Sequence, residues 1–177
     1  MKTYKEIDGK TYTYRIALKE DIIQVMEVIE DGREELKKQG NGQWQFGYPN
    51  RDNLLSDIEN GNLYVIDNGE RIVGVLAIVE GDPEYPFLES GSWLSDYPFL
   101  VMHRCAVKKE YHHKGLGMFL FEIFEEVGKE KNFHSLRLDT HEKNPIMNHL
   151  LIASGFTDCG TIILKPDKHR HVFEKLI

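Results

Sequence analysis

The sequence has few of the features that place a chain in a specialised class of protein. Cys105 and Cys159 are its only cysteines, too few for a disulfide framework, so we expect buried thiols in a reducing compartment. No uncharged run approaches the length of a membrane span, and Asp96 interrupts the apolar region near residues 90–100. Met1-Lys2-Thr3 leads into polar residues, so no signal peptide is expected. These absences predict a cytoplasmic protein with no membrane partner.

Positive charge is also scarce. Lys and Arg number 22 against 29 Asp and Glu, which gives a formal net charge of −7. Proteins that bind nucleic acid normally present a basic surface, so no nucleic-acid partner is expected. An acidic surface suits an amine substrate, but it is equally common in proteins that bind no cation.

The rest of the composition is typical of a globular domain of ordinary size. Apolar residues make up 41% of the 177 residues and charged residues 29%, which is enough to build a core with a polar surface. Because no repeat, low-complexity run or linker interrupts the chain, residues 1–177 are expected to form a single domain.

Hydrophobic periodicity predicts strands alternating with helices. The expected strands are 12–18, 63–66, 72–79, 100–107, 136–140, 156–164 and 171–176, and the expected helices start after Asp21 and at Asp52, Gly117 and Pro145. Asn68-Gly69 predicts a hairpin, whereas three prolines mark 81–98 as an inserted loop. This order mixes hairpins with crossovers. The predicted fold class is therefore α/β, as an α+β mixed sheet with helices on both faces.

The segment Val101–Leu120 joins a strand to a helix through a loop that contains two glycines. Gly115-Leu-Gly117 opens the helix, so backbone N–H groups there have no partner within the helix and little shielding by side chains. Together with the helix dipole they form a site for a phosphate or pyrophosphate. Dinucleotide folds and turns also use Gly-x-Gly, but the Walker pattern is absent and a Rossmann strand would not lie in mid-chain.

Two motifs make the chain resemble the GNAT superfamily of acetyl-CoA-dependent N-acyltransferases. The family's Arg/Gln-x-x-Gly-x-Gly/Ala, about four residues after a strand that ends Leu-Ala-Val, resembles His112-His-Lys-Gly115-Leu-Gly117 after Cys105-Ala-Val107. Its later Asn-x-x-Ala-x-x-Leu-Tyr-x-x-x-Gly-Phe resembles the segment from Asn144 to Phe156. The resemblance implies a central, mostly antiparallel sheet of six to seven strands flanked by about four helices.

The resemblance also implies a mechanism and a set of binding residues. Acetyl-CoA would be the co-substrate, no metal would be needed, and the acceptor amine would attack the thioester directly. An amide of Ala106 or Val107 would polarise the thioester carbonyl, and Lys114 would add charge beside the phosphates. The coenzyme-binding residues implied are Cys105, Ala106, Val107, His112, His113, Lys114, Gly115, Leu116, Gly117, Met118 and Asn144.

Two positions depart from the family pattern. His112 replaces the Arg or Gln that heads the loop, which should weaken a mainly backbone-mediated grip without abolishing it. Leu151 replaces a Tyr that often protonates the leaving thiolate, so another residue or water must do this, or the thiolate leaves unassisted. The missing Tyr also supports an alternative, a coenzyme A-binding sensor or degenerate family member without useful transferase activity.

His103 is the candidate general base. Strand alternation places residues 101, 103, 105 and 107 on one face. The arylalkylamine branch of the family resembles this segment, with a histidine at this position, whereas the glutamate of histone-acetylating members falls on Val101. Imidazole titrates near neutral pH, which suits removal of a proton from an ammonium substrate. The alternative is a strand histidine that is hydrogen-bonded in the core.

Aromatic and polar side chains on several segments are candidates for binding the acceptor. The aromatic rings are suited either to holding a cation or to packing on the sheet. The carboxylate of Glu80 and the polar pair Thr140-His141, both at strand ends, are suited either to binding the amine or to ordinary polar roles. The candidates are Trp44, Tyr48, Glu80, Trp93, Thr140 and His141. Neither His112-His113 nor 168–171 has partners at metal-ligand spacing, so no metal site is expected.

The expected function is therefore acetyl-CoA-dependent N-acetyl transfer to a small-molecule amine, by a monomer or homodimer. A nucleotide-binding module of another fold is the remaining alternative, and it would bind ATP or NAD in preference to acetyl-CoA.

Overall fold

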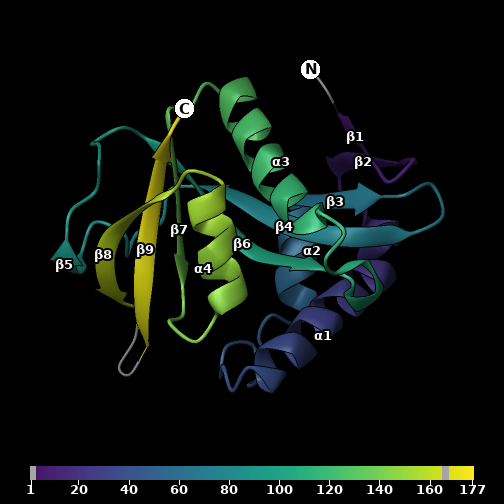
Figure 1. The fold of residues 1–177 in the computed structure, drawn as a ribbon, viewed down its shortest axis with the longest axis horizontal. Helices are drawn as coiled ribbons and strands as arrows, with labels where there is room; N and C mark the ends of the chain where they lie inside the picture. The colour runs from purple at the N-terminus through teal and green to yellow at the C-terminus, as the bar shows by residue number, and fades with distance from the viewer. Residues whose placement is uncertain (1–2, 165–167) are drawn as a thin grey trace. The chain divides into compact units, whose positions relative to one another are not determined.

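A computed structural model describes residues 3–164 and 168–177. Met1 and Lys2, on which the expected absence of a signal peptide partly rests, lie outside the described residues. The described elements include nine strands and four α-helices (Figure 1). The strands are β1 (Tyr4–Ile7), β2 (Lys10–Ile16), β3 (Leu63–Asp67), β4 (Ile72–Glu80), β5 (Leu88–Gly91), β6 (Phe99–Val107), β7 (Ser135–Thr140), β8 (Thr157–Ile163) and β9 (His169–Leu176). The helices are α1 (Ile22–Lys38), α2 (Arg51–Glu59), α3 (Leu116–Glu130) and α4 (Pro145–Ala153).

The strand order is β1-β2-β3-β4-β6-β7-β9-β8-β5. β6 and β7 pair in parallel, whereas β1–β2, β2–β3, β3–β4, β7–β9, β8–β9 and β5–β8 are antiparallel. The predicted mixed, mostly antiparallel sheet with four helices is confirmed. The predicted count of six to seven strands is too low, because β1 and β5 have only four residues each and few buried side chains.

The chain forms two compact units, which are described separately. Unit 1 comprises residues 1–78 and 103–123, and unit 2 comprises residues 79–102 and 124–177. The boundaries fall within β4, β6 and α3, so each of these elements contributes to both units.

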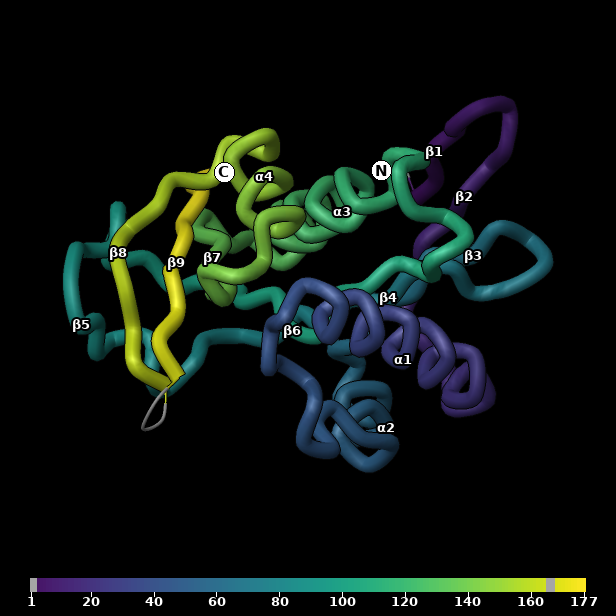
Figure 2. Tube along the Cα trace, turned by 60° about the horizontal axis from the view of Figure 1, so that its bottom comes forward, coloured from purple at the N-terminus to yellow at the C-terminus, as the bar shows by residue number. Residues whose placement is uncertain are grey.

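In unit 1, α1 and α2 cover one face of β3 and β4 (Figure 2). The buried side chains include Val25 and Ile29 of α1, Leu54 of α2, and alternate residues of the two strands, such as Val65 and Val75. Tyr14 and Phe119 meet edge to face with ring centroids 6.3 Å apart, which packs the first turn of α3 against β2. Burial of these apolar stripes is the main stabilising contribution to the unit.

The helices of unit 1 start close to the predicted positions: α1 begins directly after Asp21, and α2 begins one residue before Asp52. The carboxylate of Asp21 makes no cap hydrogen bond with α1; it accepts the N–H of Leu18 at 2.7 Å and pairs with Arg15 at 2.6 Å. Asn50 caps α2, because its Oδ1 accepts the N–H of Asn53 at 3.0 Å. Asp21 thus stands at the predicted N-cap position of α1, but the ion pair with Arg15 competes for its carboxylate.

In unit 2, the segment predicted as an inserted loop contains β5, which pairs with β8. The pairing places Gly91 opposite Gly160. The two strands lie so close there that a Cβ on Gly160 would be 2.1 Å from the carbonyl oxygen of Ser90. The rest of the segment is anchored by Tyr85, which is fully buried and stacked on Trp93 with ring centroids 5.4 Å apart. Prolines correctly indicated an irregular segment, but they concealed a four-residue edge strand.

No helix among residues 3–164 and 168–177 is both long enough and apolar enough to cross a membrane. The described part of the chain contains no disulfide: Cys105 is half-buried and Cys159 is buried.

Candidate active site

Strand β6 carries a kink at Arg104. The φ of Arg104 is 47°, in the left-handed region, which inside a strand is a mark of a β-bulge. Leu100, Val101 and Met102 before it are all buried instead of alternating in exposure. A bulge at Arg104 shifts the side chains that follow it, so the predicted alternation does not extend from Val101 and His103 to Cys105 and Val107. His103 itself is half-buried in β6.

The pairing between β6 and β7 is short. It covers Phe99–Val101 opposite Ser135–Arg137, although β6 runs on to Val107. A strand whose ladder stops part-way along its length can offer its remaining backbone groups to an extended partner. The segment Cys105–Val107, implied by the resemblance to bind an extended arm, is the last part of this strand.

His112 holds the loop that follows β6 against the end of the strand. Its Nε2 lies 2.9 Å from the carbonyl oxygen of Val107. Because a carbonyl oxygen only accepts, Nε2 must carry the proton and donate. The Nε2–H of His112 thus donates to the protein backbone instead of to a bound anion, and this hydrogen bond orders the loop.

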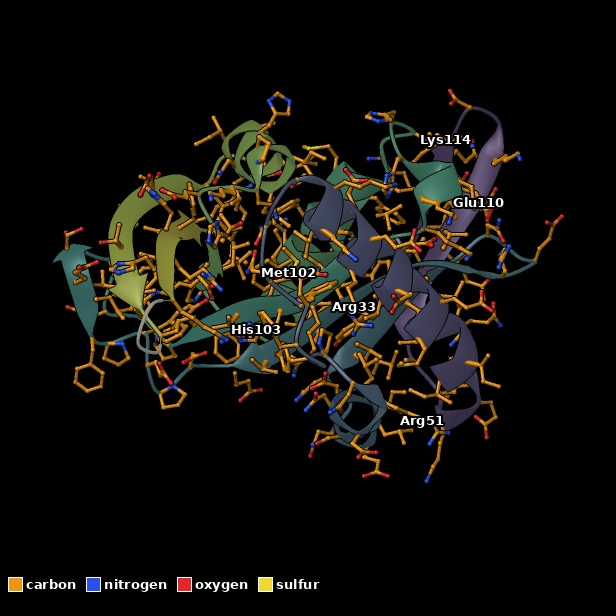
Figure 3. All side chains as sticks on the ribbon, turned by 90° about the horizontal axis from the view of Figure 1, so that it is seen from below. Arg33, Arg51, Met102, His103, Glu110 and Lys114 are labelled. Carbon is orange, nitrogen blue, oxygen red and sulfur yellow. The ribbon has the colours of Figure 1, made fainter. Side chains whose placement is uncertain are left out.

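The start of α3 has the geometry of an anion site. His113 and Gly115 take φ values of 59° and 80°, and the N–H of Phe119 donates to the carbonyl oxygen of Gly115 at 3.2 Å. The amides of Leu116 and Gly117 therefore lie in the first turn, where the helix supplies no acceptor. Lys114 is exposed on the same loop, with Nζ 5.0 Å from the ring centroid of Tyr111. Figure 3 shows Lys114 and Glu110 on this loop.

The aromatic loop between α1 and α2 is fixed by Arg33 of α1, labelled in Figure 3. Its Nε and Nη2 donate to the carbonyl oxygens of Trp44 and Pro49, both at 2.8 Å. The ring of Trp44 packs beside Gly32 and Ala106: a Cβ on Gly32 would lie 2.9 Å from Trp44 Cζ3 and 3.0 Å from Ala106 Cβ. Trp44 is thus a packing neighbour of Ala106, one of the residues expected at the thioester.

Tyr48, from the same loop, is held by the kinked residue of β6. Arg104 makes two hydrogen bonds of 2.7 Å to the carboxylate of Asp57 and one of 2.5 Å to the hydroxyl of Tyr48. Burial lowers the pKa of Arg104, but its hydrogen bond to Asp57 and the attraction of Tyr48 outweigh this, so the pKa is raised overall. Arg104 stays charged. Because the guanidinium can only donate, the hydroxyl of Tyr48 keeps its own proton available for another acceptor.

Glu80 and Trp93, two residues predicted to bind the acceptor, lie in unit 2 and contact other protein residues there. Glu80 is exposed, pairs with Lys131 at 3.4 Å, and lines a groove of about 470 Å³ with Tyr97 and Phe99 among its walls. The indole N–H of Trp93 donates to the carbonyl oxygen of Tyr85 at 2.8 Å. These contacts are those of packing and surface pairing.

The other unit 2 candidates lie at the end of β7 or after it. Thr140 is buried, and the Nδ1 of His141 accepts the N–H of Lys143 at 3.0 Å. Burial and the charge of Arg170 lower the pKa of His141. Asn144 caps α4, since its Oδ1 accepts the N–H of Met147 at 3.1 Å, which leaves its Nδ2 as the donor of that side chain. Leu151, where the family has Tyr, is fully buried.

Unit 1 therefore contains Trp44, Tyr48, His103, Cys105–Val107 and the loop 112–118, whereas unit 2 contains Glu80, Trp93, Thr140, His141 and Asn144. The sequence reading missed Arg33, Asp57 and Arg104, the residues that fix the aromatic loop. A usable signal was present, because Arg104 is the one residue of Phe99–Val107 that carries a permanent charge, and a charge inside a buried strand needs a partner. Within the described ranges, no group of three or more His, Cys, Asp and Glu could hold a metal ion.

Comparison with known proteins gives a consistent family. The model of the acetyltransferase (GNAT) family matches residues 29–156. A GNAT-family acetyltransferase from Streptococcus agalactiae is 32% identical over 97% of this chain and 98% of its own, with a TM-score of 0.86. No curated protein matches the sequence significantly.

More distant structures share the fold alone. A GNAT-family acetyltransferase from Listeria monocytogenes is 20% identical over 98% of this chain and 99% of its own, with a TM-score of 0.76. YncA from Salmonella typhimurium, whose structure includes its cofactor acetyl-CoA, is 15% identical over 93% of each chain, with a TM-score of 0.66. On the strength of the family match and the Streptococcus relative, the chain belongs to the GNAT family of acetyltransferases, which use acetyl-CoA.

Proposed function

We propose that the protein transfers the acetyl group of acetyl-CoA to the amine of a small-molecule acceptor. The observation that carries the proposal is the junction of β6 with α3. A kinked strand with a short ladder is joined through His112 to a helix start that presents backbone amides. Residues 1–177 would act as one catalytic domain, in the cytoplasm, as a monomer or homodimer.

The residues present fit acetyl-CoA. The pyrophosphate would lie on the amides of 113–118, with Lys114 alongside, because a helix N-terminus and an ammonium group both favour anions. The backbone of Cys105–Val107 would pair with the pantetheine arm. When bound, acetyl-CoA supplies an activated acetyl thioester.

The chain's own contribution to the chemistry is to orient the reacting groups and to manage charge and protons. The amide of Ala106 or Val107 would stabilise the negative charge that develops on the carbonyl oxygen, an effect worth about 3–4 kcal/mol for a well-placed donor. His103 would accept the proton of the acceptor ammonium, directly or through water. The packing of Trp44 on Ala106 would place one wall of the acceptor site beside this amide.

The proton that neutralises the departing thiolate would not come from residue 151, which is a buried leucine. The thiolate of coenzyme A is a tolerable leaving group near neutral pH, so departure without an acid is chemically feasible. A protein that binds acetyl-CoA tightly but transfers nothing to any amine would favour the sensor alternative instead.

Substitution of Gly115 tests the proposal. Its φ of 80° strains any residue with a Cβ, and only Ile7 Cδ1, at 3.8 Å, lies near the added atom. We expect Gly115→Ala to raise the Kd for acetyl-CoA at least about tenfold, because the first-turn amides move. Gly69→Ala is the matched control, with a φ of 88° and nothing within 4 Å of its Cβ. Equal Kd values for both variants, measured by calorimetry, would exclude this loop as the phosphate site.

A further inference from the structure

Three consecutive residues of α1 contact the three parts of unit 1 that the proposed reaction uses. Asp31 contacts the segment between β6 and the loop 112–118, called the coenzyme loop below. Gly32 lies beside Ala106, and Arg33 holds the aromatic loop. Successive residues of an α-helix are about 100° apart around its axis, so a single turn of α1 can face all three neighbours. All of these residues belong to unit 1.

Asp31 ties the end of β6 to α1. Its side chain is 10% exposed, and its Oδ2 accepts the backbone N–H of Lys109 at 3.0 Å. The ammonium groups of Lys108 and Lys109 each lie 3.7 Å from the same carboxylate. The two lysines directly follow Val107, the last residue of β6. The buried carboxylate therefore fixes the point at which the chain leaves the strand and turns toward the coenzyme loop.

Lys108 adds a second attachment at this point. Its side chain is 11% exposed, and its Nζ also lies 3.4 Å from the carboxylate of Glu27, one helical turn before Asp31. Its backbone N–H donates to the carbonyl oxygen of Val73 in β4 at 2.8 Å. An ammonium group with so little exposure needs nearby acids to offset its loss of hydration. The path of the chain after β6 is thus set by α1 and β4 together.

Gly32 leaves room for a side chain of the aromatic loop. Helix interiors favour Ala over Gly, so a glycine within α1 indicates a packing requirement. A Cβ at this position would lie 2.9 Å from Trp44 Cζ3 and 3.0 Å from Ala106 Cβ. The missing side chain therefore lets the indole ring lie across the helix and against a residue proposed to hold the thioester.

Arg33 holds Trp44 in a strained backbone conformation. The φ of Trp44 is 64°, in the left-handed region, which is uncommon for a bulky residue and costs free energy. Arg33 donates through Nε to the carbonyl oxygen of Trp44, and its own carbonyl oxygen accepts the side-chain amide of Gln45 at 3.0 Å. Strain of this kind persists only where the surrounding contacts impose it. The indole ring is therefore held in place by α1.

We propose that Asp31, Gly32 and Arg33 are positioning residues of the transfer reaction, an inference that rests on the proposed function. Asp31 would hold the coenzyme loop at a fixed distance from the end of β6, while Gly32 and Arg33 would hold Trp44 beside the same strand. Reactants held in one geometry react faster, because the entropy of orienting them is lost on binding and not in the chemical step. The three residues would act through their neighbours and not on the reacting atoms themselves.

Calorimetric titration with acetyl-CoA tests the coenzyme side. Asp31→Ala should raise the Kd at least about tenfold, because the N–H of Lys109 and two ammonium groups lose their acceptor. Asp31→Asn, whose Oδ1 can still accept that N–H, should raise it only about threefold and serves if Asp31→Ala does not fold. Glu34→Gln is the control: it removes an exposed acid that pairs with Nζ of Lys109 at 3.7 Å, and it should leave the Kd unchanged. Equal Kd values for the Asp31 variants and Glu34→Gln would overturn the proposal.

The NMR signal of the Trp44 indole N–H tests the acceptor side. The chain has two tryptophans, so Trp44→Phe assigns the signal. Gly32→Ala and Arg33→Gln should each move this signal in the free protein while changing the Kd for acetyl-CoA by no more than about threefold. Asp31→Ala should do the reverse, with a raised Kd and a much smaller movement of the signal. A signal that neither Gly32→Ala nor Arg33→Gln moves would refute the positioning of Trp44 by α1.

Transfer assays show whether this positioning matters to the reaction. Propylamine, benzylamine and putrescine are compared at saturating acetyl-CoA, and the amine with the highest kcat/KM is kept as the probe. Gly32→Ala and Arg33→Gln should raise the KM for this amine at least about tenfold, whereas Glu34→Gln should change neither KM nor kcat. An unchanged KM in both variants would overturn the proposal. Absence of transfer to all three amines by the wild type would count against the proposed function, and the Kd and the Trp44 signal would still decide whether α1 positions the two sides.

Discussion

Removal of the charge of Asp57 should loosen the aromatic loop between α1 and α2, which carries Trp44 and Tyr48. Its carboxylate holds Arg104 by two hydrogen bonds of 2.7 Å, and Arg104 in turn holds the hydroxyl of Tyr48. In the Asp57→Asn variant, one oxygen can still accept but the new NH₂ group faces a guanidinium that can only donate. The variant therefore replaces an ion pair by a repulsive contact between two donors.

The size of the effect follows from the burial of the pair. The two side chains are 14% and 9% exposed, so solvent screens their interaction only weakly. Breaking a fully buried pair costs about 3–5 kcal/mol, and slight exposure places this one near about 3 kcal/mol. For a chain of this length, about 1 kcal/mol lowers Tm by about 2–4 °C, so a fall of about 6–12 °C is expected.

A control lies on the same helix. Glu59 pairs with Lys19 at 3.7 Å, but the two side chains are 65% and 70% exposed, so Glu59→Gln should cost no more than about 0.5 kcal/mol. Chemical denaturation of Asp57→Asn, Arg104→Gln and the double variant gives the coupling energy, for which about 2 kcal/mol is expected. KM for the acceptor should rise while the Kd for acetyl-CoA changes little. If Asp57→Asn costs no more than Glu59→Gln, the pair does not hold the loop.

Three further predictions concern stability and catalysis. Glu174 is buried among Ser95, Ser135 and Arg137. Burial alone would raise the pKa of Glu174, but these partners lower the pKa below its ordinary value of 4.5. The ionised carboxylate therefore stabilises the fold above pH 4.5, and this stabilisation is lost as the pH falls through the folded-state pKa. Glu174→Gln should therefore cost about 3 kcal/mol at pH 7 in urea unfolding, with a gap to wild type that narrows in acid. Gly160→Ala should open the β5–β8 edge and speed amide exchange there, because its Cβ would lie 2.1 Å from the carbonyl oxygen of Ser90; unchanged exchange would contradict that contact. His103→Gln should lower kcat about 10²-fold or more, whereas an unchanged kcat would assign the base elsewhere.

Local chemistry made part of the fold readable from the sequence. Asn68-Gly69 gives the β3–β4 hairpin, in which the Oδ1 of Asn68 accepts the N–H of Arg71 at 2.9 Å. Asp8-Gly9 carries the same signal, with φ values of 50° and 72°, and its use would have predicted β1. The glycine loop before α3 was readable because helix starts and left-handed turns have strong residue preferences.

The parts that the sequence did not reveal depend on contacts between distant residues. Arg104 and Asp57 are 47 positions apart, so their pairing has no local signature, and a β-bulge shifts the strand faces without leaving a pattern of its own. The pairing of β5 with β8 depends on Gly91 and Gly160 meeting backbone to backbone. Each of these contacts is decided by tertiary packing, which overrides local propensity.

Isothermal titration of the wild-type protein with acetyl-CoA tests the central proposal most directly. Binding by the amides of 113–118 and the end of β6 predicts one site per chain, with a Kd between about 1 µM and 1 mM, and weaker binding of ATP and NAD. Coenzyme A should compete for the same site. Absence of binding at about 1 mM acetyl-CoA, or tighter binding of ATP or NAD, would contradict an acetyl-CoA site at the junction of β6 and α3.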